Sequence, residues 1–229
     1  MNFDHIILTR FNVKISWAGQ IKADADWLKH RFLLFDKYCF PSMRSQTNKN
    51  FRWLVLFDTD TPDFYKEKIT DYAKWECFIP QYIKKFDTQT YRTCVKSLLN
   101  RNVTGIVTTR LDNDDAVGIH FVDEIQKHFQ YQKFMYLNFP NGYLLRENTL
   151  YQVKKRTNAF ISLFENSDNF ITAWYGNHME ANNRGMVQNV HTTPLWIQVI
   201  HEYNIKNTVG RAHKIVPITE LSGRFVVSN

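Results

Sequence analysis

The sequence has few cysteines and no long apolar run. Its three cysteines, Cys39, Cys77 and Cys94, are odd in number, widely spaced and without a C-x-x-C pair. They therefore indicate neither a disulfide framework nor a zinc knuckle. No apolar run approaches the roughly 20 residues that a membrane-spanning helix needs. The amino-terminal stretch MNFDHIILTRFN has an acid before a short apolar run, which is not typical of a secretory signal, so we expect a cytoplasmic protein.

Glycine-rich loops, low-complexity tracts and internal repeats are also missing from the sequence. An early Gly-rich phosphate loop would favour many nucleotidyltransferases, and a basic stripe would favour a nucleic-acid partner. Acidic residues are outnumbered by basic ones, and the formal net charge of +7 favours an anionic ligand. The basic residues are nevertheless spread along the chain. With 229 residues, 44% of them hydrophobic, the chain can bury a substantial core, and we expect one domain.

Short apolar runs alternate with segments of helical period, which indicates an α/β sandwich. The candidate strands are HIILTRF, RWLVLFD, CFIPQYI, GIVTTRLD and KFMYLNF. Apolar residues recur at helical spacing over residues 24–46, and we expect Pro41 to end or kink that helix. In the second half we expect a hairpin at NFPNGYLLREN, a short helix in KKRTNAFISLFEN and a helix that begins at Thr193-Pro194.

Charged residues follow three of the candidate strands at the point where each strand ends. Arg10 ends the first strand, Asp58 ends RWLVLFD and Asp112 ends GIVTTRLD. The carboxyl ends of parallel strands lie on one edge of a sheet, where open α/β sheets bind ligands. We therefore expect these side chains to converge on one rim.

The stretch RLDNDDA places three carboxylates, Asp112, Asp114 and Asp115, directly after a buried strand. Alternation along an extended chain points Asp112 and Asp114 the same way, where they repel unless a cation lies between them. Mg²⁺ and Mn²⁺ prefer such hard oxygen ligands and complete their shells with water and phosphates. The alternative is an Asx-rich turn that caps a helix beginning near Ala116 or Val117. The charged ends of the neighbouring strands favour a metal-diphosphate site.

Several motifs, in order, resemble one family of enzymes. The segments ILTRFNV, FDKYCFPSMRSQTNKNFRWLVLFDTDTP, TTRLDNDDAV and PLWIQVIHEYN resemble the rhamnosyltransferase family, and RLDNDDA resembles the D-x-D motif of GT-A nucleotide-sugar glycosyltransferases. The resemblance covers most of the chain. It implies a GT-A-like α/β/α sandwich with a mostly parallel central sheet, a Rossmann-like nucleotide-sugar-binding half at residues 1–117 and an acceptor-binding half at residues 118–229.

The resemblance also implies roles for the acids. Asp112 corresponds to the acid beside the donor ribose, and it can share a metal ion with Asp114, which corresponds to the metal ligand. Asp115 is a close alternative ligand or a support for the site. Some GT-A enzymes supply a further metal ligand from a late histidine, for which we expect His191, with His178 and His201 as alternatives. His201 lies on an expected helix, where packing is the other role open to it.

Further roles are implied outside the acid motif. Asp58 corresponds to the aspartate that contacts the donor base, and Arg10 and Arg110 are placed to balance the diphosphate. Inverting transfer needs a general base from the second half, for which we expect Glu180 in the loop GNHMEANNR. The rivals for this role are Glu165, Asp168, His178 and Glu202.

The sequence therefore predicts a metal-dependent, inverting glycosyltransferase. It would transfer a hexosyl group, with rhamnosyl as one candidate, from a nucleotide-sugar donor to a glycan or polysaccharide hydroxyl, with Mn²⁺ or Mg²⁺ as cofactor. Two alternatives from other classes stay open. One is a metal-dependent nucleotidyltransferase or nuclease, and the other is a non-catalytic carbohydrate-binding module.

Overall fold

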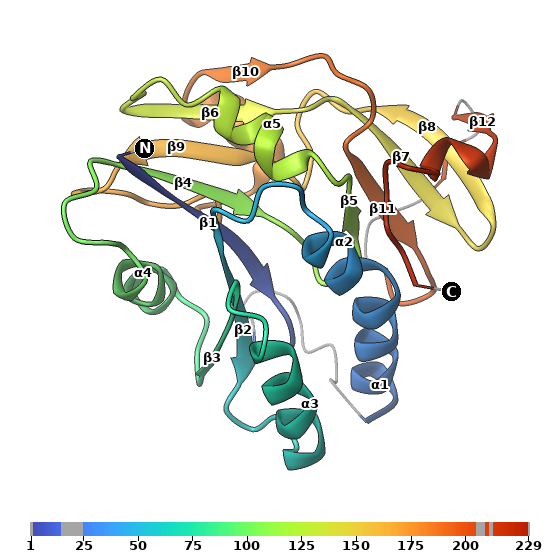
Figure 1. Cartoon of the computed structure of the whole chain (residues 1–229), viewed down its shortest axis with the longest axis horizontal. Coiled ribbons are helices and arrows are strands. Elements are labelled where there is room, and N and C mark those ends of the chain that lie inside the picture. The colour runs from blue at the N-terminus through green and yellow to red at the C-terminus, as the bar shows by residue number, and fades with distance from the viewer. Residues whose placement is uncertain (1, 15–24, 205–208, 211–212, 229) are drawn as a thin grey trace.

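A seven-stranded sheet forms the centre of the protein (Figure 1). The computed structural model describes residues 2–14, 25–204, 209–210 and 213–228. In sheet order the strands are β10 (Val187–Asn189), β6 (Phe134–Asn138), β9 (Ser162–Asn166), β4 (Gly105–Arg110), β1 (Phe3–Arg10), β2 (Arg52–Asp58) and β3 (Phe78–Ile83). Strands β4, β1, β2 and β3 run parallel, and only β9 opposes its neighbours among the described residues. The mostly parallel central sheet is confirmed.

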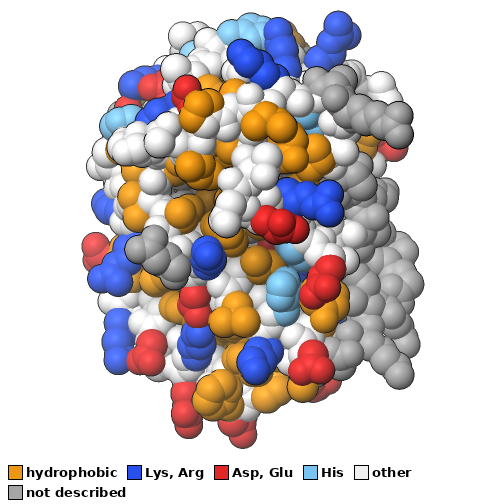
Figure 2. Space-filling model, turned by 90° about the vertical axis from the view of Figure 1, so that its right-hand side faces the viewer, with side chains coloured by type: hydrophobic (Ala, Val, Ile, Leu, Met, Phe, Trp, Pro, Cys, Tyr) orange, Lys and Arg blue, Asp and Glu red, His pale blue; other side chains and the backbone are white. Residues whose placement is uncertain are grey.

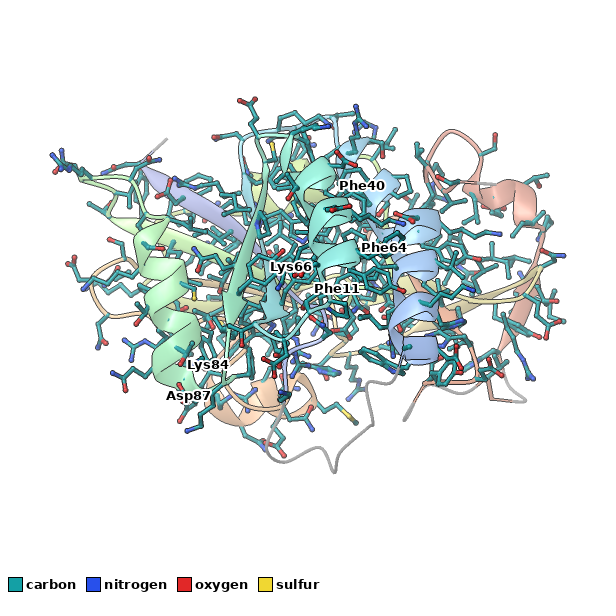
Figure 3. The ribbon with its side chains drawn as sticks, turned by 90° about the horizontal axis from the view of Figure 1, so that it is seen from below. Phe11, Phe40, Phe64, Lys66, Lys84 and Asp87 are labelled. Atoms are coloured by element: carbon teal, nitrogen blue, oxygen red, sulfur yellow. The ribbon has the colours of Figure 1, made fainter. Side chains whose placement is uncertain are left out.

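Helices cover both faces of this sheet. On one face lie α1 (Ala25–Leu34), α2 (Phe40–Arg44), α3 (Asp63–Ala73) and α5 (Phe121–Lys127). On the other face lie α4 (Thr88–Ser97) and the short α6 (Ala181–Arg184). Viewed from below, β3 passes between α4 on one side and α3 on the other (Figure 3). The α/β/α arrangement is therefore confirmed, and no helix of the described residues is long and apolar enough to cross a membrane.

A second, five-stranded sheet packs beside the first. Its strands, in order, are β12 (Lys214–Val216), β8 (Thr149–Lys154), β7 (Asn141–Arg146), β11 (Trp196–Ile200) and β5 (Ala116–Val117). The pairing of β7 with β8 confirms the expected hairpin. Because β5 follows the acid motif directly, the loop from Leu111 to Asp115 connects the two sheets.

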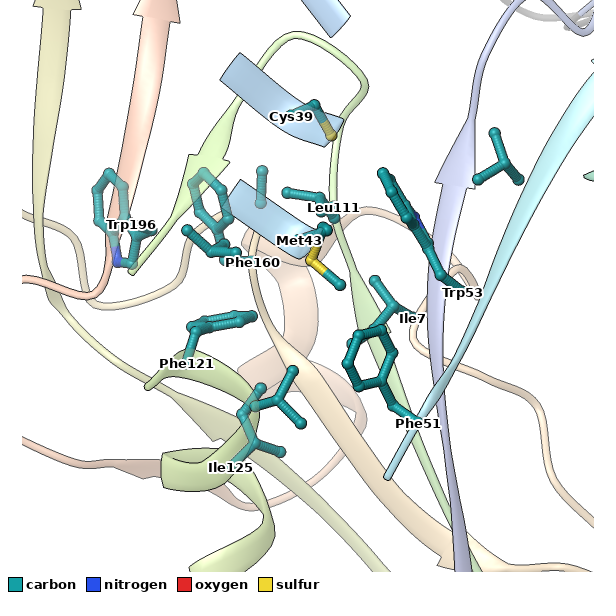
Figure 4. Packing of buried hydrophobic residues seen from close by; sticks show 14 of the residues in the cluster. Ile7, Cys39, Met43, Phe51, Trp53, Leu111, Phe121, Ile125, Phe160 and Trp196 are labelled. Atoms are coloured by element: carbon teal, nitrogen blue, oxygen red, sulfur yellow. The ribbon is translucent and has the colours of Figure 1, made fainter. Parts of the chain in front are cut away.

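One hydrophobic cluster joins the sheets and fixes that loop from both sides. In Figure 4, Trp53 of β2 and Trp196 of β11 lie on opposite sides, with Met43, Leu111 and Phe160 between them. Both indole N–H groups are satisfied: Trp53 donates to Thr9 Oγ1 and Trp196 to the Phe139 carbonyl, each at 2.8 Å. A loop anchored between two packed sheets can hold charged side chains in fixed positions.

Two expected helices are strands. The segment KKRTNAFISLFEN contains β9, which is hydrogen-bonded on both sides between β4 and β6, and the segment after Pro194 contains β11, paired with β7 and β5. Short apolar runs that are buried on both faces do not show whether they are helical or extended. The partner strands, which lie far away in sequence, decide the matter here.

The structure also excludes two local alternatives that the sequence left open. The helix does not end at Pro41: a π-helical turn, Phe35–Cys39, precedes Pro41 and the helix then continues to Arg44. In this turn the Phe40 N–H donates to the Phe35 carbonyl, which is the wider spacing of a π-helix. Asp115 is followed by strand β5, so the acids do not cap a helix at Ala116.

Candidate functional site

Arg10, Asp58 and Arg110 lie at the carboxyl ends of three adjacent parallel strands. Arg10 pairs in register with Leu56, and Arg110 pairs with Leu8. Because side chains alternate between the faces of a sheet, all three lie on the face that α4 covers. The structure therefore brings these three predicted site residues to one rim.

Asp58 is the last residue of β2, and only one of its two carboxylate oxygens accepts a hydrogen bond from the described residues. It is 4% exposed, and Oδ1 accepts the Asp60 N–H at 2.8 Å. Oδ2 accepts no hydrogen bond from the described residues and lies 3.7 Å from Lys14 Nζ. One buried oxygen is thus left to bind a ligand.

The two arginines of the rim have different surroundings. The Arg10 guanidinium lies 5.3 Å from the centre of the Phe86 ring. Arg110 is buried, and burial lowers its pKa to about 10, partly offset by Asp112, so it stays charged at neutral pH. Both cations face the rim without a hydrogen bond to a carboxylate among the described residues.

Asp114 is already paired inside the protein. Its Oδ2 accepts from Arg31 Nη1 at 2.5 Å and contacts His201 Nε2 at 2.8 Å, and its side chain is 9% exposed. Burial alone would raise the pKa of Asp114, but the His201 hydrogen bond and the charges of Arg31 and His201 outweigh burial and lower it. The carboxylate is therefore ionised and compensated by groups from α1 and the end of β11.

Asp115 and Asp112 differ in their exposure to solvent and in their hydrogen bonds. Asp115 is 1% exposed, and its Oδ1 accepts the Val199 N–H at 2.9 Å. Burial and the neighbouring charges of Asp114 and Asp112 raise its pKa well above the ordinary value. Asp112 is partly exposed, and its carboxylate accepts no hydrogen bond from the described residues. Asp115 ties the loop to β11, whereas Asp112 stays available to a ligand.

His201, and not His191, is the histidine that reaches the acids. In the β11–β5 ladder Trp196 pairs with Val117, so the chain beyond β11 runs back along the acid loop. His191 is exposed and makes no hydrogen bond or ion pair with the acids. The sequence indicated neither contact, because the short run WIQVI does not show whether it is helical or extended and no feature marks Arg31.

The contacts of Asp114 test whether a divalent cation suits this site. A carboxylate oxygen and an imidazole nitrogen that already lie 2.8 Å apart suit Mn²⁺. No group of three His, Cys, Asp or Glu side chains among the described residues could hold an ion by itself. An ion here would need water and phosphate oxygens to complete its shell, which is usual for Mg²⁺. Asp114 and His201 could supply two ligands to such an ion once it replaces the hydrogen bonds that Asp114 Oδ2 now makes.

The segment that carries Glu180 is mostly exposed. Glu180 ends a 3-10 turn, His178–Glu180, and its Oε2 lies 3.6 Å from Arg184 Nη1. Its rival Glu165 is buried in β9 and accepts two backbone N–H groups from Ile171 and Thr172, while burial raises its pKa to about 7. Glu165 therefore holds a turn, whereas Glu180 is exposed to solvent, as are its rivals Asp168 and Glu202.

The two packed sheets and the charged rim define a class, the GT-A fold of nucleotide-sugar transferases. A structure of S. aureus TarS 1–349 in complex with UDP-GlcNAc matches with a TM-score of 0.52 and 9% identity, over 88% of this chain and 60% of that chain. Another structure of TarS 1–349 matches with a TM-score of 0.50 and 7% identity, over 86% and 60%. This chain therefore spans about 60% of the length of TarS 1–349.

A comparison of the sequence with known families shows to which family the chain belongs. The profile of the family described as "Putative rhamnosyl transferase" matches residues 9–212, and the chain belongs to this family. No curated protein matches the chain.

Proposed function

We propose that the protein transfers a hexosyl group, with rhamnosyl as one candidate, from a nucleotide-sugar donor to a glycan or polysaccharide hydroxyl. The observation that carries the proposal is the rim, where Asp58, Arg10 and Arg110 meet at the ends of parallel strands in a member of the rhamnosyl transferase family. The UDP-GlcNAc bound to TarS supports a nucleotide-sugar donor.

Each rim residue then has a role towards the donor. Asp58 offers its free Oδ2 to the base or ribose, and Asp112 offers its carboxylate to the ribose. Arg10 and Arg110 balance the diphosphate, because guanidinium groups match phosphate oxygens in pairs. Asp115 does not contact the donor in this proposal, because it is buried and bound to the backbone of Val199.

A divalent ion, Mn²⁺ or Mg²⁺, would be held by Asp114 and His201. Bound there, it would supply positive charge to the leaving diphosphate. His201 thus replaces His191 in the proposed ligand set, since only His201 contacts Asp114. Before an ion binds, Arg31 neutralises the carboxylate.

The acceptor would bind on the exposed segment around Glu180. We assign to Glu180 the removal of the acceptor hydroxyl proton during inverting transfer. Glu180→Gln should lower turnover about a hundredfold while donor affinity persists, which is the usual effect of losing a general base. Turnover and donor binding are measured separately, by product formation and by calorimetry. Near-normal turnover would transfer the role to Asp168 or His178.

The donor site is tested by calorimetric titration of UDP, GDP and dTDP, each with Mn²⁺ and with chelator, into the wild-type chain. Asp58→Asn should weaken nucleotide binding at least tenfold, because a buried oxygen aimed at the ligand loses its charge. Asp60→Asn is the matched control, since Asp60 is exposed and paired with Lys14. If all three nucleotides fail to bind under every condition, the proposed function is wrong.

An oligonucleotide in the same titration tests the nuclease alternative. On the face drawn in Figure 2, Lys and Arg side chains are interspersed with acidic and hydrophobic ones and form no continuous stripe among the described residues. Nucleic-acid interfaces are characterised by such stripes. A free sugar tests the carbohydrate-binding alternative, which predicts binding without nucleotide.

A further inference from the structure

Arg110 carries a buried positive charge that no described residue neutralises by contact. It is 7% exposed, its Nε has no hydrogen-bond partner, and no described carboxylate lies within ion-pair distance of it. Burying a charge without a partner is strongly unfavourable. The protein tolerates this arrangement although an apolar residue would fit the rim at lower energetic cost, which points to an anionic ligand.

A second arginine approaches the rim from the other half of the chain. Arg184, at the end of α6, donates from Nε to the Tyr136 hydroxyl at 3.3 Å and from Nη2 to the Asn177 carbonyl at 2.5 Å. Gly176 makes room for it: φ is +70°, and an added Cβ would lie 2.6 Å from Arg184 Nη1. The side chain of Arg184 is therefore held in one position, 17% exposed.

Arg184 contacts Tyr136, which pairs with Leu163, and Leu163 pairs with Thr108 of β4. Thr108 lies two residues before Arg110 and on the same face of the sheet, so both arginines lie on that face.

Burial and then, in decreasing order, the charges of Arg110, Lys155, Arg10 and Arg184 together lower the pKa of His178 to about 3. Arg184 and Arg10 also act on Arg110 itself. Arg184 has one anionic neighbour, Glu180 Oε2 at 3.6 Å from Nη1, but no described carboxylate lies within ion-pair distance of Arg110. The remaining like charges repel each other unless a further anion lies between them.

We infer that Arg110 and Arg184 together form an anion site for the diphosphate of the donor, with Arg10 at its edge. The inference rests on the proposed function and extends it, because Arg184 comes from the acceptor half. The forked guanidinium groups would each give paired hydrogen bonds to phosphate oxygens. The diphosphate would then connect β4 to α6, in the second half of the chain.

Inorganic pyrophosphate, titrated calorimetrically into the full chain in chelator at low salt, isolates this site from base, sugar and metal ion. Wild-type protein should bind it, and Arg110→Met and Arg184→Met should each weaken binding tenfold or more, as expected for charge-assisted hydrogen bonds. Tyr136→Phe removes the hydroxyl that positions Arg184 and should weaken binding less. Arg146→Met, at an exposed end of β7, is the control and should leave the affinity unchanged.

Circular dichroism verifies that each variant is folded. Lack of pyrophosphate binding by the wild-type chain, or wild-type affinity in folded Arg184→Met, overturns the inference. An equal loss in Arg146→Met also overturns it, because the effect would then be general charge attraction. If the wild-type chain binds a nucleotide and Arg184→Met keeps the wild-type affinity for pyrophosphate, the inference is wrong and the proposed function stands. If pyrophosphate binding needs both arginines but no nucleotide binds, the anion site stands and the proposed function is wrong.

Discussion

The rim has two charged clusters that are built in opposite ways. In the acid cluster, Asp114 is compensated by Arg31 and His201 within hydrogen-bond distance. In the arginine cluster, Arg110 is equally buried but has no carboxylate in contact among the described residues. One cluster is balanced within the protein, and the other is left with net positive charge.

The difference separates a buried charge that the protein compensates by itself from one that it leaves uncompensated. A buried ion pair is costly to break, because the remaining partner keeps its charge without compensation. A buried single charge is costly to keep, and replacing it with an apolar residue can stabilise the free protein. The two clusters should therefore respond to substitution with opposite signs.

The largest effect should come from breaking the acid cluster. Arg31→Met leaves Asp114 buried with only His201 and should lower the free energy of unfolding by about 3–5 kcal/mol. Urea denaturation measures this loss. Arg44→Met, on the exposed end of α2, is the control and should have little effect. Added Mn²⁺ should raise the free energy of unfolding of Arg31→Met more than that of the wild type. If Arg31→Met is as stable as the wild type without Mn²⁺, Arg31 does not compensate Asp114.

A smaller effect of opposite sign is expected at the arginine cluster. Arg110→Met removes an uncompensated buried charge and should raise the free energy of unfolding of the free protein by about 1 kcal/mol or more. The same denaturation measurement without ligand tests it. A clear loss of stability would show that Arg110 has a structural partner, and the comparison of the two clusters would fail.

A third effect concerns protonation of His178. Because burial and the nearby cations hold its pKa near 3, folded His178 stays neutral while the unfolded chain takes up a proton below pH 6.5. Stability from this residue is thus complete above pH 6.5 and is lost as the pH falls towards 3. In Arg110→Met the pKa of His178 should rise towards 6.5, as followed by NMR of the ring protons. An unchanged pKa in that variant would place Arg110 away from His178.

Much of the first half of the chain could be predicted from the order of the residues. Runs such as RWLVLFD and GIVTTRL are apolar, β-branched and bounded by charged residues, so their length and composition identify them as buried strands. Parallel connection through helices then places Arg10, Asp58 and Arg110 on one edge without any knowledge of packing. These local signals do not depend on distant partners.

Other features were decided only by tertiary contacts. WIQVI is a strand because it forms hydrogen bonds with β7 and β5, and SLFEN is a strand because it forms them with β4 and β6. The sequence of a short apolar run does not identify such partners. The position of β11 brought His201 to Asp114, and the packing of α1 brought Arg31 to the same oxygen. The sequence by itself determined which charges lie at the strand ends, and the tertiary structure decided which of them are neutralised, since partners come from segments that are 83 and 87 residues away.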